Sequence, residues 1–405
     1  MGFYQKCYLK KNNKTINPAE VPRRAPRRRV APARDTGGTA ASCFPFSRKR
    51  AMQVVTPLGT AVDIPNTLAE DRPYFRPEEI GEAMGYYNQE GYVVIRGLLP
   101  PDLCDAIRTA YRTEVRPSGT PILRQKNMRY ERNSFDEDGF LANPIFNVQD
   151  LETRRFGRFK QSAMLGLTQQ RVAQVTAALI GAGPTKLIQS MFFEAPVGTW
   201  AHQDSYYQDS AAGLGRCVAG WYALEDVDAA AGRFYVCPRS HHTIPVLRNA
   251  GELNFATGHD RYRKAVVNTI RQNALELRAP YMAKGDVLFW SSLTVHGSFA
   301  PSGRGVSRSS LTAHYLPQED EMLQFHTRLR KQKIISLNNM PVAQLHDQDL
   351  LRNRLVRGVA AHAPSTYATA RKLAMQGLFL AGRLRSGLGL IPGPKKTAGP
   401  TVNHI

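Results

Sequence analysis

The sequence predicts a mainly β fold with flanking helices, of the sandwich or barrel kind, for the central part of the chain. From Lys186 onward, short runs rich in β-branched and aromatic residues follow one another, and turn residues separate them. Several short strands in series are typical of all-β sandwiches and barrels, of which the jelly roll is one form. The runs are 187–194, 218–224, 232–236, 287–290 and 310–315.

Helical patterns precede and interrupt these strands. The pattern Arg-Pro-Glu-Glu that begins at Arg76 puts proline and acidic residues in a first turn, which predicts that a helix begins there. The remaining expectations follow from hydrophobic periodicity and composition. They are a strand at 91–95, helices at 100–113 and 169–180, a long loop region at 120–160, and a helical insert at 245–275.

The charge of the chain is concentrated in its two ends. The 405 residues include 54 Lys and Arg against 33 Asp and Glu, a formal net charge of +21. Residues 1–50 and 326–405 each hold 13 basic and 2 acidic residues, whereas 51–325 is nearly neutral. We therefore expect a basic, disordered tail at 1–51, a folded domain at 52–325 and a basic helical C-terminal extension at 326–405.

Each end has a functional and a plainer interpretation. The first tail has the composition of a nucleic-acid or membrane arm. A solvated tail, or an artefact of start-site choice, is favoured instead, because a normal globular sequence follows Met52. In the last segment, Leu373, Leu380 and Leu384 lie at helical spacing beside basic residues, as in a helix on an anionic membrane surface. Packing of that helix on its own domain is favoured, and membrane contact is the weaker alternative.

The composition also indicates a compartment. Five cysteines are scattered through the chain with no Cys-x-x-Cys pair, which argues against a disulfide scaffold and suits a reducing cytosol. No apolar run approaches the ~18 residues of a membrane span. We expect a cytoplasmic protein with no specific nucleic-acid partner, since the central domain lacks a basic stripe with interleaved aromatic residues.

Two segments carry residues that suit a metal. His202 and Asp204 follow a strand at positions i and i+2, so their side chains project to one face of an extended chain. His296 lies 92 residues beyond Asp204, after another expected strand. Two imidazoles and one carboxylate on a jelly roll leave open coordination positions, the arrangement of non-haem Fe(II) oxygenases. Arg308, 12 residues further, could pair with a carboxylate of a co-substrate, and Arg304 competes for that role.

Further stretches extend this pattern in a fixed order. They are 202–204, 221–227, 231–241, 284–286, 296–298 and Arg308. Together they resemble the phytanoyl-CoA dioxygenase family of Fe(II)- and 2-oxoglutarate-dependent oxygenases, over roughly residues 75–317. The resemblance implies a double-stranded β-helix, a cupin-like jelly roll, as the core of a dioxygenase domain at 52–325. Two departures are Arg239, where the family usually has glycine, and a loop before Arg308 that is one residue longer than usual.

The resemblance also implies roles for individual residues. His202, Asp204 and His296 would bind Fe(II) and form the catalytic centre, with 2-oxoglutarate and O₂ as co-substrates. Arg308 would pair with the distal carboxylate of 2-oxoglutarate, and Ser298 would assist it. The remaining two residues are Trp221, which matches the family's aromatic residue beside the co-substrate, and Gln189, which matches a pocket-lining position.

The expected activity is hydroxylation of an unactivated C–H bond of a small molecule, with release of succinate and CO₂. Desaturation and cyclisation are alternatives within the class, and an inactive cupin-like binding protein is an alternative outside it. A nucleic-acid dioxygenase is disfavoured by the neutral central domain. Among the other residues, Trp290 and His314 are expected to be packed core side chains.

Overall fold

The computed structural model describes residues 52–56, 61–71, 73–181, 183–243, 255–324, 328–330, 332–370 and 373. All of them belong to one compact unit that begins at Met52. The expected tail at 1–51 lies outside the described residues, as does the expected C-terminal helix beyond Leu373. Within the described ranges, none of the helices combines the length and the apolar character needed to cross a bilayer.

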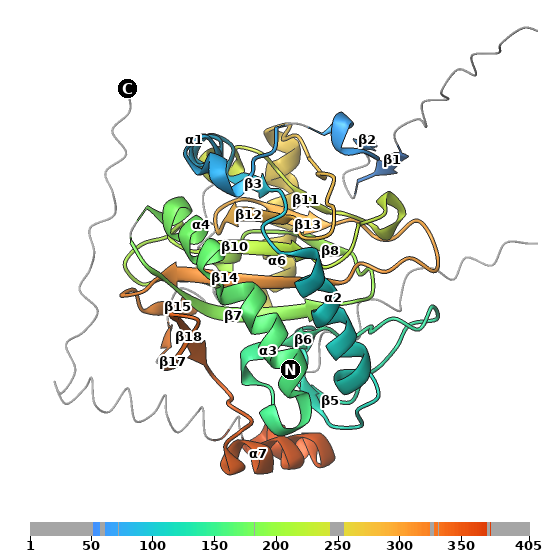
Figure 1. Cartoon of the computed structure of the whole chain (residues 1–405), viewed down its shortest axis with the longest axis vertical. Coiled ribbons are helices and arrows are strands. Elements are labelled where there is room, and N and C mark those ends of the chain that lie inside the picture. Colours follow the sequence, from blue (N-terminus) through green and yellow to red (C-terminus); the bar gives the residue numbers. More distant parts are fainter. Residues whose placement is uncertain are drawn as a thin grey trace, which may run out of the picture. The chain divides into compact units, whose positions relative to one another are not determined.

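A large sheet forms the centre of the unit (Figure 1). Along its main path the strand order is β17-β18-β7-β14-β10-β12-β3, and β6 pairs with β7 beside that path. All pairings are antiparallel except that of β18 with β7. The strands are β3 (Tyr92–Ile95), β6 (Ile145–Phe146), β7 (Thr185–Phe193), β10 (Val218–Ala223), β12 (Val287–Ser291), β14 (Ser310–Pro317), β17 (Lys333–Leu337) and β18 (Met340–Gln344).

Smaller sheets complete the β structure. The strand order of the sheet that matters for the site is β11-β13-β8, and that of another small sheet is β16-β15-β9. The large sheet and the β11-β13-β8 sheet form a double-stranded β-helix, so the predicted fold class is confirmed. The remaining strands are β1 (Met52–Val55), β2 (Ala61–Ile64), β4 (Ile122–Leu123), β5 (Tyr130–Glu131), β8 (Thr199–His202), β9 (Gln208–Ser210), β11 (Phe234–Val236), β13 (His296–Ser298), β15 (Met322–Gln324) and β16 (Arg328–Arg330).

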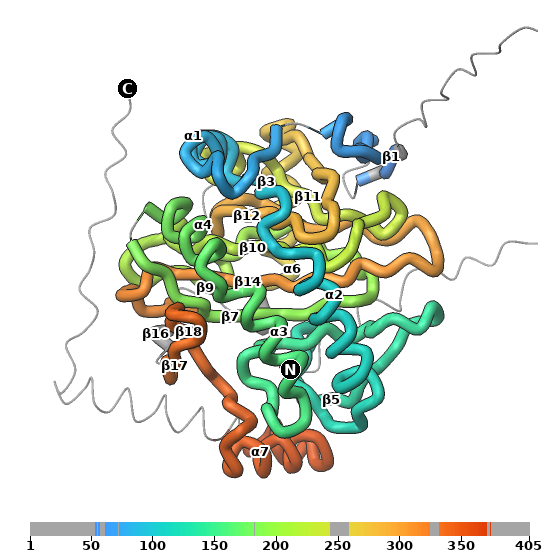
Figure 2. Tube along the Cα trace, in the orientation of Figure 1, coloured from blue at the N-terminus to red at the C-terminus, as the bar shows by residue number. Residues whose placement is uncertain are grey.

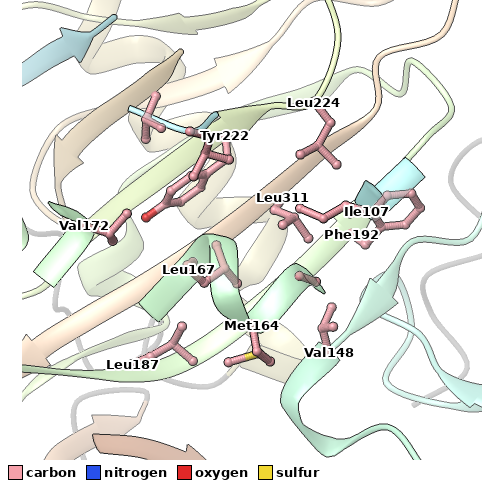
Figure 3. Close-up of a cluster of buried hydrophobic side chains, with 14 of the residues drawn as sticks. Ile107, Val148, Met164, Leu167, Val172, Leu187, Phe192, Tyr222, Leu224 and Leu311 are labelled. Carbon is pink, nitrogen blue, oxygen red and sulfur yellow. The ribbon is translucent and has the colours of Figure 1, made fainter. Parts of the chain in front are cut away.

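Helices α2, α3 and α4 lie across one face of the large sheet (Figure 1). Side chains from these helices, such as Ile107, Leu167 and Val172, meet Phe192 and Tyr222 of the sheet in a continuous apolar core (Figure 3). Since apolar side chains fill this face, we expect a functional site on the opposite face of the sheet. The helices are α1 (Ile80–Glu90), α2 (Pro101–Ala110), α3 (Thr153–Thr168), α4 (Gln170–Ile180), α5 (Ser240–Thr243), α6 (Phe255–Gln272) and α7 (Leu351–His362).

Two segments differ from the sequence-based expectation. The region 120–160 holds short strands and the first half of α3, because Phe156, Phe159 and Ala163 form an apolar stripe that is masked in the sequence by many Arg residues. The expected helical extension at 326–405 begins with β16, which pairs with β15, and continues with the hairpin of β17 and β18. The pairing of Val342 with Leu187 joins this hairpin to the large sheet. Figure 2 shows the chain continuing from this hairpin to α7 at the lower edge of the view.

A buried ion-pair network fixes the edge of the large sheet. Arg96, directly after β3, places Nη1 2.5 Å from Asp286 Oδ2 and Nη2 3.3 Å from Asp71 Oδ2. The Asp286 carboxylate also accepts hydrogen bonds from the backbone of Gly97 and Ala283. Burial raises the pKa of Asp286, and Arg96 opposes that rise. The network joins the start of β12 to the end of β3, and it depends on each charge keeping its partner.

We expect that Asp286→Ala lowers the free energy of unfolding by about 3 kcal/mol, because it removes the nearer of the two carboxylates that pair with the buried Arg96 and leaves only Asp71. Urea-induced unfolding followed by fluorescence measures this change. Asp105→Ala is the matched control, since Asp105 pairs with Lys284 on the surface and is 56% exposed; its effect should stay below about 1 kcal/mol. Equal effects of the two substitutions would contradict the role given to the network.

Candidate metal centre

His202 and Asp204 lie where β8 ends. His202 is the last residue of the strand, and Asp204 begins a short 3₁₀ turn, Asp204–Tyr206. Gln203 between them is anchored from α6, because its backbone N–H donates to the Tyr262 hydroxyl at 2.9 Å. Helix α6, the expected insert, thus holds the turn that presents the two side chains.

His296 joins them from the neighbouring strand. In the pairing of β13 with β8, His296 stands opposite His202, and their ring centroids are 4.3 Å apart. Each histidine places Nε2 3.6 Å from Asp204 Oδ1. Candidate ligand atoms of the three residues all lie within 4.8 Å of one another. The tertiary structure therefore brings together the three residues that the sequence pattern singled out.

Backbone carbonyls orient both imidazoles. Nδ1 of His202 lies 2.9 Å from the carbonyl oxygen of Trp200, and Nδ1 of His296 lies 2.9 Å from that of Thr294. A carbonyl only accepts, so Nδ1 carries the proton and Nε2 keeps its lone pair for a metal. Burial lowers the pKa of His296 to about 3, although Asp204 opposes the change. His296 is therefore neutral at neutral pH, as metal binding requires.

The second oxygen of Asp204 is held from the large sheet. Trp290 Nε1 donates to Oδ2 at 2.8 Å, and His314 Nε2 lies 3.2 Å from the same oxygen. Burial alone would raise the pKa of Asp204, but the imidazoles of His296 and His314 outweigh it and hold the pKa well below its usual range. The carboxylate is thus ionised, with Oδ1 directed toward the two histidines.

Sequence reasoning treated Trp290 and His314 as ordinary core residues. Both are buried, but they also face the candidate ligands. Ala219 of β10 pairs with Trp290 on one side and with His314 on the other, so all three share one row of the sheet. A small alanine between two large polar rings leaves room for a carboxylate above it. That signal appears only when the strand register is known.

The donor set fits a divalent iron ion. Two neutral imidazole nitrogens and one carboxylate oxygen converge on one point, which matches the three-ligand face of non-haem iron sites. Three protein donors leave other coordination positions for exogenous ligands. The outer contacts of His202, His296 and Asp204 are all satisfied by protein groups, so the three side chains are held in place for a metal.

Ser298 lies one step along β13 from His296, and Arg308 contacts its side chain. Ser298 follows His296 by two residues on β13, so both side chains face the same way about 7 Å apart. Arg308 Nη2 donates to Ser298 Oγ at 3.4 Å and to the Val197 carbonyl at 2.7 Å, while Nη1 donates to the Gly232 carbonyl.

The environment of Arg308 is unusual for a cation. The residue is 4% exposed, and its Nε has no hydrogen-bond partner. Among the described residues, no carboxylate pairs with its guanidinium, which is held by carbonyl and hydroxyl oxygens alone. Burial lowers the pKa of Arg308 to about 10, so the group stays charged at neutral pH. A buried guanidinium without an acidic partner is suited to an anionic ligand.

The competing Arg304 has a different environment. It is exposed, and its guanidinium pairs with Glu137 at 2.9 Å and with Asp138 at 3.0 Å. These carboxylates already satisfy its charge. The geometry therefore favours Arg308 over Arg304 as the anchor of an acidic co-substrate.

Trp221 and Gln189 lie on the same side of the large sheet as the candidate ligands. Trp221 packs against Phe234 at 6.1 Å between ring centroids, and Phe234 stacks on His296 at 5.5 Å. The ring of Phe234 therefore lies between Trp221 and His296. Gln189 pairs across β7 and β14 with His314, so its side chain shares the face that points to Asp204.

Comparison with known proteins gives one family match. A family model described as phytanoyl-CoA dioxygenase matches residues 87–310, more than half of the chain. No curated protein matches the chain in sequence.

Several solved structures are similar to the chain. The epimerase SnoN, in complex with Fe³⁺, alpha ketoglutarate and nogalamycin RO, is 19% identical, with 62% of this chain and 88% of that chain covered and a TM-score of 0.46. The alpha ketoglutarate dependent carbocyclase SnoK is 19% identical, with 62% and 89% covered and a TM-score of 0.45. EctD from S. alaskensis, with 2-oxoglutarate and 5-hydroxyectoine, is 14% identical, with 70% and 90% covered and a TM-score of 0.44.

The contact between Trp290 and Asp204 generates a prediction. Trp290→Phe removes the N–H that donates to Oδ2 and should weaken Fe(II) binding about 10–100-fold, because the carboxylate loses one of the two groups that orient it. Anaerobic titration with Fe(II), without 2-oxoglutarate, measures the affinity. Trp221→Phe is the matched control, since it also removes an indole but makes no contact with Asp204, and it should leave the affinity unchanged. Equal losses in both variants would refute the orienting role.

The family match covers every candidate residue from Gln189 to Arg308. The same span contains the convergent His202, Asp204 and His296. The predicted resemblance is confirmed: the chain belongs to the phytanoyl-CoA dioxygenase family and is a non-haem Fe(II)- and 2-oxoglutarate-dependent dioxygenase.

Proposed function

We propose that the protein hydroxylates an unactivated C–H bond of a small molecule, at the centre formed by His202, Asp204 and His296. The observation that carries the proposal is the combination of this three-donor set with the buried, acid-free guanidinium of Arg308, which contacts Ser298 two residues beyond His296. One part suits a metal and the other suits the far carboxylate of a dicarboxylic co-substrate.

In this proposal, His202, Asp204 and His296 hold Fe(II), and Arg308 with Ser298 anchors 2-oxoglutarate. When bound, iron with 2-oxoglutarate and O₂ supplies the oxidation of the substrate C–H bond, with release of succinate and CO₂. The chain's own contribution is positional. Trp290 and His314 fix the carboxylate of Asp204, and the aromatic rings of Phe234 and Trp290 pack around His296 and limit the access of water.

The substrate side of the centre is proposed to lie toward α6. The Tyr207 ring is 5.6 Å from the His202 ring, and its hydroxyl lies 2.9 Å from His259 Nε2 on α6. Asp209, by contrast, is buried in a network with Ser205 and Ser292 and serves the local fold. Tyr207 and His259 are therefore the better candidates for substrate contact.

The alternatives to hydroxylation differ in what they require of the centre. An inactive binding protein would not need a complete donor set with oriented imidazoles, so the intact centre argues against it. Desaturation and cyclisation use the same centre and differ from hydroxylation only in the product.

We also infer a reducing, cytosolic location, supported by Cys104, Cys217 and Cys237, which are buried free thiols.

Succinate formation tests the reaction class. Protein loaded anaerobically with Fe(II) and then supplied with 2-oxoglutarate, O₂ and a panel of small molecules should form succinate, and His296→Ala should abolish it because the donor set is incomplete. Iron and 2-oxoglutarate binding is measured in the same samples. Binding of both without succinate would indicate that the substrate is missing from the panel. Failure to bind iron would refute the proposal.

Arg308→Lys tests the proposed anchor. Lysine keeps the charge but loses the two-pronged hydrogen bonding, so the KM for 2-oxoglutarate should rise about 10–100-fold, in line with the loss of a charge-assisted hydrogen bond. The matched control is Arg304→Lys, for which the KM should not change, because Arg304 is exposed and paired with acids. If Arg304→Lys raises the KM and Arg308→Lys does not, the anchor has been assigned to the wrong arginine.

A further inference from the structure

Helix α7 carries large apolar side chains on its solvent side. Leu351, Leu355 and Val359 are 64%, 63% and 53% exposed, and Val356 beside them is 45% exposed. Residues 351, 355 and 359 recur every four positions, so they form one stripe along the helix. Scattered apolar residues on a surface need no explanation, but an aligned stripe of this kind marks an interaction site.

The other side of α7 meets the protein through the small Ala360, which is 7% exposed and packs with Leu123 and Tyr130, and through polar side chains. Arg357 Nη2 pairs with Glu152 at 2.8 Å and its side chain is only 11% exposed. Asn353 Nδ2 donates to the Asp347 carbonyl at 2.7 Å, and Arg354 Nη1 donates to the Asp349 carbonyl at 3.3 Å. The large apolar side chains of α7 thus point outward, whereas its inner side contacts the protein through Ala360, Asn353 and Arg357.

A basic hollow lies beside the same helix. Its volume is about 490 Å³, and no acidic residue lines it. Glu152 is a shared ion-pair partner of Arg155 and Arg357, which leaves most of the positive charge around the hollow uncompensated. Such a hollow suits phosphate groups. The charged and titratable residues that line it are Arg132, Arg155, Arg354, Arg357 and His362.

The charge of α7 and of the residues after it in the sequence favours one class of partner. Residues 350–405 contain nine Lys and Arg and no Asp or Glu. Positive charge of this kind is complementary to any polyanion, but the aliphatic stripe of α7 offers nothing to nucleic-acid bases or sugars. An apolar stripe together with basic side chains is the combination that binds the surface of an anionic bilayer.

We propose that α7 docks the protein on an anionic phospholipid surface. Leu351, Leu355 and Val359 enter the interface between headgroups and acyl chains, and the arginine hollow faces the headgroup phosphates. The contact is peripheral, and α7 lies at the end of the unit away from β8 and β13 (Figure 1). The proposal therefore goes beyond the oxygenase reaction and does not rest on it.

Vesicle co-sedimentation of the full chain tests this proposal. Binding is expected to vesicles of phosphatidylcholine mixed with phosphatidylglycerol, with much weaker binding to phosphatidylcholine alone and a decrease as salt is added. The double substitution Leu355→Ser and Val359→Ser should lower the partition coefficient at least about tenfold, because the buried aliphatic carbons are lost. The matched control is Leu165→Ser, which should leave the partition coefficient unchanged. Leu165 lies on α3 and is 42% exposed.

A second pair of variants tests the hollow. Arg132→Gln with Arg354→Gln should weaken binding to the anionic vesicles only, whereas Arg271→Gln on α6 should not. Unchanged circular dichroism and succinate formation would show that the variants are folded. Two results would overturn the proposal: vesicle binding that is absent or insensitive to the Leu355 and Val359 substitutions, or a concentration-dependent dimer that those substitutions dissociate, which would make a second copy the partner.

Discussion

The division of labour between the two oxygens of Asp204 is the constraint on which the rest of the site depends. Oδ1 lies 3.6 Å from Nε2 of both His202 and His296, while Oδ2 is held by Trp290 and His314. The first pair comes from the small sheet and the second from the large sheet. A single carboxylate therefore links the two layers, and the centre keeps its geometry only if both sheets pack in register.

Burial of the Arg308 side chain has an energetic cost. A buried guanidinium that meets only carbonyl and hydroxyl oxygens has lost its hydration without gaining an opposite charge. The fold sustains it partly through Gly232, whose φ of +68° belongs to the left-handed region and whose missing Cβ would lie 2.7 Å from the Ala300 carbonyl carbon. In the role proposed for Arg308, binding of an anionic co-substrate would offset this energetic cost and so stabilise the folded protein.

The helices around the β structure have different roles. Helices α2, α3 and α4 pack on one face of the large sheet through a continuous apolar core (Figure 3). Helix α6 holds the turn that carries Asp204 and brings His259 near Tyr207. Helix α7, remote from both, turns its apolar side outward. The proposed reaction, the proposed substrate approach and the proposed membrane contact thus involve different parts of one unit.

The sequence by itself determined the strand series and the spacing of His202, Asp204 and His296, because alternation along a strand is a local property. Local patterns also indicated the insert that became α6 and the charged ends. Only the tertiary structure distinguished Arg308 from Arg304 and revealed Trp290 and His314 as partners of Asp204, since these contacts depend on register between distant strands. For the same reason, the joining of β18 to the large sheet and the outward face of α7 followed from long-range packing and not from residue order.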